Sequence, residues 1–170
     1  MVNKPLVLGI AGDSGVGKTS FSKGLATVFG ERSLAEVSGD DYHNWERSSP
    51  MWKTLTHLDP KANRLFALVR DVQSLLNGEV VKARQYDHVS GLFLPQEIRK
   101  SKDVILVEGL HTLYPKQLLQ VYDVSFFIEM EESLRLFFRS KRDIKERGHS
   151  KEVVLSEVEK RKADGEKYIK

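Results

Sequence analysis

The stretch Gly-Asp-Ser-Gly-Val-Gly-Lys-Thr, at positions 12–19, constrains this chain more than any other. It fits the phosphate-loop pattern G-x-x-x-x-G-K-[ST], which belongs between a strand and a helix N-terminus. The run before it, at 5–11, is apolar and short, as a buried parallel strand should be. The run after it places apolar side chains at helical spacing, namely Phe21, Leu25, Val28 and Phe29. We therefore predict a strand over 5–11 and a helix over 17–29.

This loop is suited to hold the phosphates of a nucleoside triphosphate. Glycines allow the backbone amides to surround an anion, and the helix N-terminus adds its positive dipole end. Lys18 would reach the β- and γ-phosphates, and Thr19 would offer its hydroxyl to Mg²⁺. We expect nucleotide contacts along the whole loop, from Gly12, Asp13, Ser14, Gly15, Val16, Gly17, Lys18, Thr19 and Ser20.

Bulk composition narrows the class of protein. The 170 residues are enough for one domain with a real core, and the hydrophobic share of 40% is ordinary for a soluble chain. The absence of cysteine excludes disulfides and thiolate chemistry. A net charge of +3 is mild, so we expect a phosphate-rich small ligand rather than nucleic acid or a membrane. The early first strand leaves no room for a signal peptide, so we expect a cytoplasmic protein, and homo-oligomers are compatible with the sequence.

Strands and helices alternate along the remainder of the chain. We predict strands at 34–37, 103–109 and 124–128, and an extended segment or hairpin at 80–91. We predict helices from Asp59-Pro60 to Asn77-Gly78, at 114–120, at 131–147, and from Ser150 to the end, with a loop over 45–57. This alternation indicates one α/β domain over 1–170, with a parallel sheet between two helical layers.

Acidic residues follow two of the predicted strands. Asp40 and Asp41 come after the strand at 34–37, and Glu108 ends the strand at 103–109. Ligands of open α/β sheets bind beyond the carboxyl ends of strands, so these carboxylates can face the phosphate loop. One of the two aspartates could orient an attacking hydroxyl, and Glu108 could hold Mg²⁺. An acidic turn or helix cap explains the aspartates equally well, and Glu108 could be only a strand-end residue.

The predicted helix at 131–147 carries clustered arginines. Arg135, Arg139 and Arg142 fall at i, i+4 and i+7 and so share one face. We assign the core side of this helix to its apolar residues, Leu134, Phe137, Phe138 and Ile144. A helix–turn–helix with arginines near a nucleotide suggests a lid, over about 139–152, that closes on the γ-phosphate. A solvated basic helix face is the alternative.

Together, these motifs resemble the phosphoribulokinase/uridine kinase family of P-loop kinases. The resemblance covers nearly the whole chain. It rests on six stretches in order, at 12–19, 39–43, 58–63, 86–91, 107–111 and 142–150. It implies a three-layer, nucleotide kinase-like α/β fold with a helical lid, and an ATP-dependent kinase that uses Mg²⁺.

The resemblance also implies a role for individual residues. Asp40 matches the catalytic base near the metal, and Glu108 matches the second acidic residue near Mg²⁺. Lys18 and Thr19 match the phosphate-loop pair. Arg142 and Arg147 match lid arginines, and Arg139 is expected to join them. The acceptor pocket is expected to include Asp59, Tyr86 and His88.

The acceptor implied by the resemblance is a pentose-containing small molecule. Most motifs are similar to the phosphoribulokinase branch, whose acceptor is ribulose 5-phosphate. Uridine kinases tend to carry a base-recognising His where this chain has Gly91, and Arg where it has His149. The chain is shorter than members of either branch and stops where the family continues into another strand. It is therefore either a fragment or an atypical member.

Two other classes of protein fit the sequence less well. A P-loop GTPase needs a guanine-reading Asn-Lys-x-Asp after the loop, and the only Asn-Lys pair, Asn3-Lys4, precedes it. A non-catalytic ATP-sensing domain of a larger protein is compatible with the short chain. It does not explain why Lys18, Asp40 and Glu108 are all present.

Overall fold

The computed structural model describes residues 4–169 and is built around a parallel sheet. Four strands make up this sheet in the order β2-β5-β1-β6. Their bounds are Leu6–Ala11 for β1, Leu34–Ser38 for β2, Val104–Gly109 for β5 and Val124–Phe127 for β6. All neighbours in the sheet are parallel. The carboxyl ends of the strands therefore meet at one edge.

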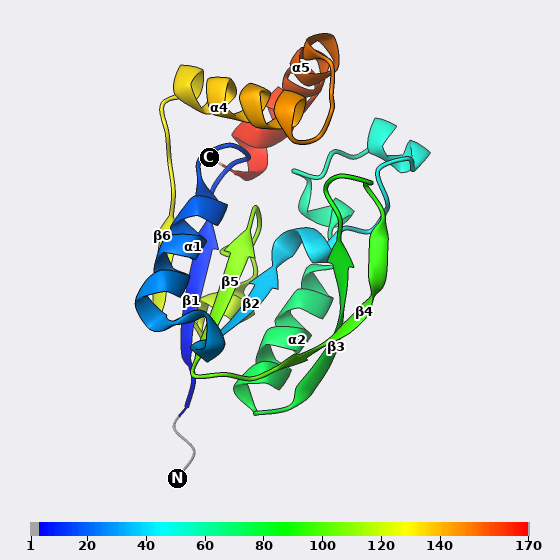
Figure 1. Cartoon of the computed structure of the whole chain (residues 1–170). Helices are drawn as coiled ribbons and strands as arrows, with labels where there is room; N and C mark the ends of the chain where they lie inside the picture. Colours follow the sequence, from blue (N-terminus) through cyan, green and yellow to red (C-terminus); the bar gives the residue numbers. More distant parts are fainter. Residues whose placement is uncertain (1–3, 170) are drawn as a thin grey trace.

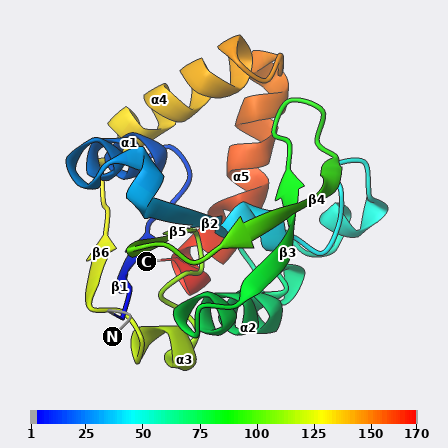
Figure 2. The same ribbon diagram turned by 60° about the horizontal axis from the view of Figure 1, so that its bottom comes forward.

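Helices cover both faces of the sheet (Figure 1 and Figure 2). Helix α1 (Lys18–Phe29) lies on one face, while α2 (Leu65–Leu76) and α3 (Lys116–Leu119) lie on the other. The α1 side is packed by Leu8, Ile10 and Leu106 among others, and the α2 side by Val7, Val37, Leu68 and Val72 among others. The predicted three-layer α/β fold is confirmed, although Val28 of α1 stays 79% exposed.

A second, two-stranded sheet lies beside the main one. Strand β3 (Val80–Tyr86) pairs antiparallel with β4 (Phe93–Lys100), and Val81 and Ala83 join the core under α2. The predicted hairpin at 80–91 is confirmed only as its first strand and turn. Strand β4 carries Pro95 and mostly exposed side chains, so it lacks the apolar alternation that marks a strand.

The helix predicted from Asp59-Pro60 begins later than expected. Residues Pro60–Ala62 form a single 3₁₀ turn, which the Asp59 side chain caps through the Lys61 amide at 2.8 Å. Asn63 is then extended and pairs with His43 in an isolated bridge, so α2 starts at Leu65. Asp and Pro favour such a cap, but they do not determine how many turns follow. Other 3₁₀ turns span Glu31–Ser33, Gly39–Tyr42 and Pro50–Lys53.

Helices α4 (Glu132–Lys145) and α5 (Lys151–Tyr168) lie above the carboxyl edge of the sheet (Figure 1). The prediction for the core side of α4 is wrong. Its apolar residues Leu134, Phe137, Phe138 and Ile144 are all exposed, Phe137 to 60%. Its buried residues are charged instead, with Arg139 only 4% and Asp143 only 5% exposed. No helix within residues 4–169 is both long and apolar enough to cross a bilayer.

We predict that Gly9→Ala destabilises the fold by about 1–3 kcal/mol through overpacking. An added Cβ at Gly9, in the middle of β1, would lie 2.7 Å from the Tyr122 ring. That ring is held because its hydroxyl donates to the Thr112 carbonyl at 2.8 Å. Gly24→Ala in α1 is the control, since its Cβ would meet no atom within 4 Å. In urea unfolding, the free energy of unfolding of Gly24→Ala should equal or exceed that of the wild type. Equal free energies of unfolding for Gly9→Ala and Gly24→Ala would contradict this packing.

Candidate active site

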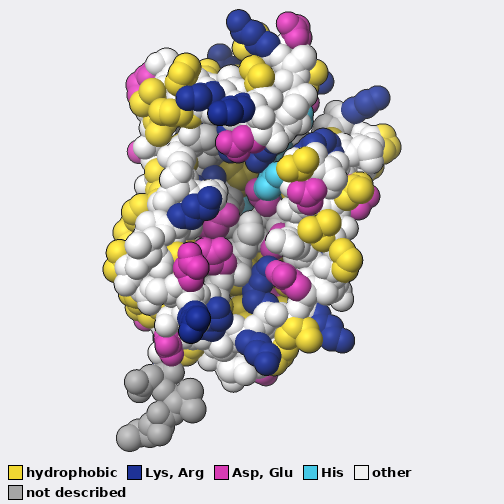
Figure 3. All heavy atoms as spheres, viewed as in Figure 1, with side chains coloured by type: hydrophobic (Ala, Val, Ile, Leu, Met, Phe, Trp, Pro, Cys, Tyr) yellow, Lys and Arg dark blue, Asp and Glu magenta, His cyan; other side chains and the backbone are white. Residues whose placement is uncertain are grey.

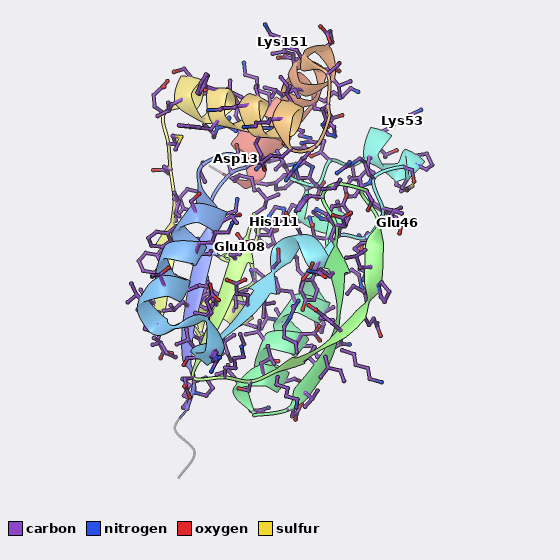
Figure 4. The ribbon with its side chains drawn as sticks, viewed as in Figure 1. Asp13, Glu46, Lys53, Glu108, His111 and Lys151 are labelled. Carbon is purple, nitrogen blue, oxygen red and sulfur yellow. The ribbon has the colours of Figure 1, made fainter. Side chains whose placement is uncertain are left out.

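The strand order brings three sequence motifs to one place. Strand β5 lies between β1 and β2, and Glu108 on β5 is level with Ile10 on β1 and Ser38 on β2. The phosphate loop follows β1, and Asp40 follows β2. Glu108 therefore stands between the strand that leads into the loop and the strand that leads into Asp40, at the edge where α/β sheets bind ligands. Figure 4 shows Glu108 below Asp13 at this edge.

The phosphate loop has the form expected for binding an anion. Gly15 and Gly17 have φ angles of +94° and +93°, a region that other residues rarely adopt. The Lys18 ammonium folds back over the loop and donates to the carbonyls of Gly12 and Asp13, at 2.9 and 3.0 Å. Thr19 and Ser20 are exposed at the start of α1. The loop therefore presents its lysine, a free hydroxyl and a helix N-terminus to the same space.

Asp40 is held by two histidines. The Nε2 atoms of His88 and His43 lie 3.0 and 3.6 Å from its carboxylate oxygens. Burial alone would raise the pKa of Asp40. The hydrogen bond from His88 and the charges of His43, His88 and Lys18 outweigh it, so the pKa lies well below its usual range. Asp40 is therefore an ionised carboxylate at neutral pH, aimed at the cavity in front of the phosphate loop.

The neighbouring Asp41 has a structural role. Its carboxylate accepts the Tyr86 amide at 2.8 Å and the Arg99 guanidinium at 3.1 Å, so it ties the β3–β4 hairpin to the end of β2. The structure thus gives different surroundings to the two aspartates, which the residue pattern alone did not distinguish, although the family resemblance had singled out Asp40. Asp40 is the one whose carboxylate stays beside Lys18 and Glu108.

Mg²⁺ fits the donors at this edge, although the protein alone does not make a complete site. Glu108 is a carboxylate whose pKa is raised by burial and by the charge of Asp40, and a nearby cation would relieve this repulsion. Thr19 supplies an exposed hydroxyl. Within residues 4–169 no three His, Asp or Glu side chains converge as a metal cage. Mg²⁺ commonly binds through one or two carboxylates together with substrate phosphates, and Thr19, Asp40 and Glu108 suit that mode.

Helix α4 is attached to the phosphate loop by its arginine face. The Arg135 guanidinium lies 2.7 Å from the Asp13 carboxylate, and that of Arg142 donates to the Ser14 hydroxyl at 3.1 Å. Gly15 allows this close approach, because a Cβ there would lie 2.9 Å from the Arg135 carbonyl oxygen. The prediction that Arg135, Arg139 and Arg142 share a face is confirmed, and that face is turned inward.

Asp143 organises the remaining arginines, a role that the sequence analysis missed. Its carboxylate lies 2.9 Å from Arg142, 3.3 Å from Arg147 and 3.6 Å from Arg139. The sequence does contain a signal for this role, because Asp143 lies four residues after Arg139 and four residues before Arg147. The buried Nε of Arg139 has no hydrogen-bond partner among residues 4–169, and the Asp143 carboxylate is 3.6 Å from it.

A single cavity of about 1530 Å³ connects these groups. Figure 3 shows the hollow between the main sheet and the β3–β4 hairpin, with Lys and Arg side chains around it. The predicted residues that line it are Ser14, Gly15, Gly17, Lys18, Thr19, Ser20, Asp40, Tyr86, His88, Glu108, Arg139, Arg142 and Arg147. Gly12, Asp13 and Val16 belong to the loop but do not line the cavity, and Asp59 is a buried turn cap away from it.

The cavity is also lined by a residue outside the sequence motifs. Arg47 lines it, and its guanidinium donates to the carbonyls of His88 and Val89. Lys53 of the same segment lies on an outlying turn (Figure 4). Arg84 stacks on Phe93 and donates to the His43 carbonyl. No local pattern marks Arg47, because it lies in an aperiodic loop.

Aromatic rings form the wall opposite the phosphate loop. His43 lies edge-on to Trp52 and Tyr86, with ring centroids 5.6 and 5.2 Å apart. His57 joins this group at 6.0 Å from His43, and burial lowers its pKa well below the usual value, so it is neutral. The loop predicted over 45–57 therefore does cover the site. Its rings Trp52 and His57 line the cavity together with His43 and Tyr86 and give it an aromatic side.

We predict that Asp143→Asn destabilises the fold by about 1–3 kcal/mol at pH 7, because buried arginines lose their shared carboxylate. Burial would raise the pKa of Asp143, but Arg142, Arg147 and Arg139 lower it. A lowered pKa stabilises the fold above the ordinary value of about 3.9, and this contribution is lost as the pH falls through the folded-state pKa. In urea unfolding, the free energy of unfolding of the wild type should therefore exceed that of Asp143→Asn by a constant amount above pH 5. This difference should shrink below pH 4. Asp103→Asn, at an exposed position, should show no such difference.

Comparisons with known proteins agree with this geometry. A model of the phosphoribulokinase/uridine kinase family matches residues 7–170. The chain is 32% identical over 168 residues to a phosphoribulokinase of Synechocystis sp., covering 99% of this chain and 51% of that protein. It is 35% identical over 161 residues to a uridine kinase of Bacillus cereus, covering 91% and 74% respectively.

The fold is shared with a solved phosphoribulokinase from Rhodobacter spheroides. The TM-score is 0.77 at 18% identity, over 98% of this chain and 66% of that one. The chain spans about half the length of the phosphoribulokinases of Synechocystis sp. and Triticum aestivum. The match of the family model, together with the phosphate loop and the acidic strand ends at one edge, shows that the chain belongs to the phosphoribulokinase/uridine kinase family.

Proposed function

We propose that this protein is an ATP-dependent kinase that transfers the γ-phosphate to a hydroxyl of a pentose-containing acceptor. The acceptor proposed is a sugar phosphate, ribulose 5-phosphate or a related compound. One observation carries the proposal: Lys18, Asp40, Glu108 and the arginines of the lid line a single cavity. A phosphoryl-transfer site needs a phosphate cradle, a base and cations over the γ-phosphate, and these residues would supply all three.

In this proposal Asp40 receives the proton of the acceptor hydroxyl. The hydroxyl oxygen forms a bond to the γ-phosphorus while the bond from that phosphorus to the β–γ bridging oxygen breaks, and ADP leaves. Because Asp40 is a weak base, it takes the proton only as the new bond forms. Lys18 and the lid arginines stabilise the charge on the transferring group, and Mg²⁺, held near Thr19, Asp40 and Glu108, would neutralise the phosphates when bound.

The lid proposed at 139–152 comprises the end of α4, the turn after it and the start of α5. Arg139, Arg142 and Arg147 face the cavity from this segment. Positive charge is concentrated further by Arg161 of α5, whose pKa is lowered to about 10 by burial and then by the charge of Arg139. Such a wall favours a triphosphate, whose oxygens would replace repulsion between arginines with ion pairs.

The charge at the acceptor end favours an acceptor that carries a phosphate. Arg47, Arg147 and His149 line this end of the cavity. Burial lowers the pKa of His149, and the charge of Arg47 is the next cause, so His149 is neutral at pH 7 and the positive charge at this end comes from Arg47 and Arg147. A nucleoside has no anionic group to match them. A pentose phosphate has one at the end remote from its reacting hydroxyl.

A uridine or cytidine kinase is the second candidate. The aromatic wall of His43, Trp52 and Tyr86 could stack a base, and the Bacillus cereus relative is named a uridine kinase. A non-catalytic ATP sensor is less well supported, because it has no use for a carboxylate held beside Lys18. In this proposal the enzyme is cytoplasmic and its partners are small molecules. Association of its copies into homo-oligomers is compatible with this function.

The first test is release of ADP from Mg-ATP with ribulose 5-phosphate, uridine or cytidine as acceptor. We expect turnover with ribulose 5-phosphate. Asp40→Asn should lower kcat by about 10²–10⁴-fold while thermal unfolding stays cooperative. The matched control is Asp103→Asn, the same chemical change at an exposed position. Undiminished turnover in Asp40→Asn would remove Asp40 from the mechanism, and turnover with nucleosides alone would overturn the proposed acceptor.

A second test addresses the charge at the acceptor end. Arg47→Ala should raise KM for ribulose 5-phosphate about 10–100-fold, the equivalent of one charge-assisted hydrogen bond, and leave KM for ATP nearly unchanged. Lys53→Ala removes the same charge from the same segment but from outside the cavity, so it should change neither constant. Steady-state kinetics measures both. An equal increase in KM for ribulose 5-phosphate in the two variants would indicate that binding depends only on the overall charge of the protein.

A further inference from the structure

Helix α4 carries a second stripe of side chains on the side away from its arginine face. The stripe is formed by four residues at intervals of three, four and three positions, namely Leu134, Phe137, Lys141 and Ile144. Each residue of an α-helix is turned by about 100° from the one before it, so residues at these intervals stay on one side. The buried arginine face, which contains Arg139, lies on nearly the opposite side of the same helix.

This stripe is exposed although most of it is apolar. Phe137 is 60% exposed, Leu134 45% and Ile144 43%. Figure 3 shows hydrophobic side chains together on the surface of α4. The helix cannot roll to hide them, because Arg135 and Arg142 on its other side are bound to the phosphate loop. Soluble monomers rarely expose a contiguous apolar surface, so the stripe indicates a contact surface for another molecule.

The intervals within the stripe are those of a coiled-coil seam. In a heptad repeat, the residues at positions a and d follow one another at spacings of three and four. Leu134 and Lys141 take the a positions, and Phe137 and Ile144 take the d positions. A single lysine at an a position costs stability, but it specifies the register in which two helices pair.

The flank of the seam has opposite charges at its two ends. The e positions of the repeat are occupied by Glu131, Phe138 and Lys145. Glu131 caps the helix, because its carboxylate accepts the amides of Ser133 and Leu134 at 3.0 and 3.1 Å. The hydrogen bonds from the Ser133 hydroxyl and from these amides lower the pKa of Glu131, so it is ionised at neutral pH. A negative charge thus lies at the N-terminal end of the flank and a positive charge at its C-terminal end.

An antiparallel pair of such helices satisfies the seam, whereas a parallel pair does not. In a parallel pair, Lys141 would face the same lysine of the second helix across an apolar seam. In an antiparallel pair centred on the middle of α4, Lys141 faces Phe137 of the second helix, and Leu134 faces Ile144. The ammonium group then lies against an aromatic ring, which attracts it through the ring quadrupole.

The same antiparallel register also pairs the charges of the flank. Positions e of the two helices lie on the same side of an antiparallel seam, and charges there set partner choice and orientation. Glu131 and Lys145 are equally far in sequence from Phe138. Glu131 of each helix therefore faces Lys145 of the other, while the two Phe138 rings meet near the two-fold axis. The surface is complementary to itself, as a two-fold interface requires.

We propose that Leu134, Phe137, Lys141 and Ile144 dock on the same four residues of a second copy of this chain, as an antiparallel pair of α4 helices. The two lids then lie back to back, and the arginine face of each is turned toward its own cavity. The inference concerns the outer side of α4 and does not depend on which acceptor, if any, is phosphorylated.

The expected dimer is weak, because the seam is short. The 14 residues of α4 extend over about 21 Å. Two paired helices of this length bury less surface than a protein–protein interface of standard size, so we expect a dissociation constant in the micromolar range.

Sedimentation velocity over a range of protein concentrations tests the pairing. The wild type should change from monomer to dimer as its concentration rises through the micromolar range. Phe137→Glu should raise the dimer dissociation constant about 30-fold or more, the effect of losing a central interface residue. Phe66→Glu is the matched control, since Phe66 is 86% exposed on α2, away from the lid (Figure 1). Thermal unfolding should remain cooperative in both variants, because both side chains are exposed.

A second measurement tests the antiparallel register. Lys145→Glu should weaken the dimer, because it places two carboxylates together at each end of the seam. Glu131→Gln keeps an oxygen that can cap the helix but removes the charge, so Lys145→Glu should weaken the dimer less in that background. Lys151→Glu, the same charge reversal at an exposed position outside the seam, should leave the dissociation constant unchanged. Additive effects of the first two substitutions would overturn this register.

The remaining outcomes are equally decisive. A dimer that Phe137→Glu leaves intact would place the interface elsewhere and overturn the inference. A wild type that stays monomeric at all concentrations would overturn it as well. If that monomer instead binds vesicles of phosphatidylglycerol, the stripe is a membrane contact. All of these measurements are made without substrates, so loss of the proposed kinase activity and loss of this inference are separate results.

Discussion

The parallel pairing of β5 between β1 and β2 is the constraint on which the site depends. It places Glu108 level with Ile10 and Ser38, so the loop after β1 and the aspartate after β2 meet on either side of it. The pairing is stabilised by the apolar side chains of both sheet faces, which are far from the chemistry. The polar edge can therefore keep an unfavourable pair of carboxylates beside a buried lysine, because the core holds their backbones in place.

Helix α4 shows how this edge reverses the usual arrangement of an amphipathic helix. Burial of Arg139 and Asp143 is tolerated because their charges are paired, and because Arg135 and Arg142 are bound to the phosphate loop. The apolar face of α4 is left outward at Phe137 and Phe138. A helix that packed by hydrophobicity alone would have hidden these rings and turned its arginines to water. Its orientation is better explained by anion binding than by core formation.

The sequence could predict those parts of the fold that short-range patterns determine. The loop at 12–19, the strand ending in Glu108 and the arginine face of α4 each follow from local spacing. What it could not predict depends on contacts between distant segments: the inward turn of α4, the late start of α2 at Leu65, and the attachment of Asp41 to the β3–β4 hairpin. Arg47 belongs to the same group, because its importance comes from the turn at 87–91 and not from its neighbours in sequence.

The central claim is that one cavity brings phosphates, metal and base together at the carboxyl edge of the sheet. The most direct measurement is a crystal structure with a non-hydrolysable ATP analogue and Mn²⁺ in place of Mg²⁺, which locates the metal by its anomalous scattering. We expect one metal peak bonded to phosphate oxygens and to Thr19, with Asp40 or Glu108 bonded directly or through water, and Lys18 turned from the loop carbonyls to the phosphates. Phosphates bound away from 12–19, or a metal remote from all three residues, would contradict this account.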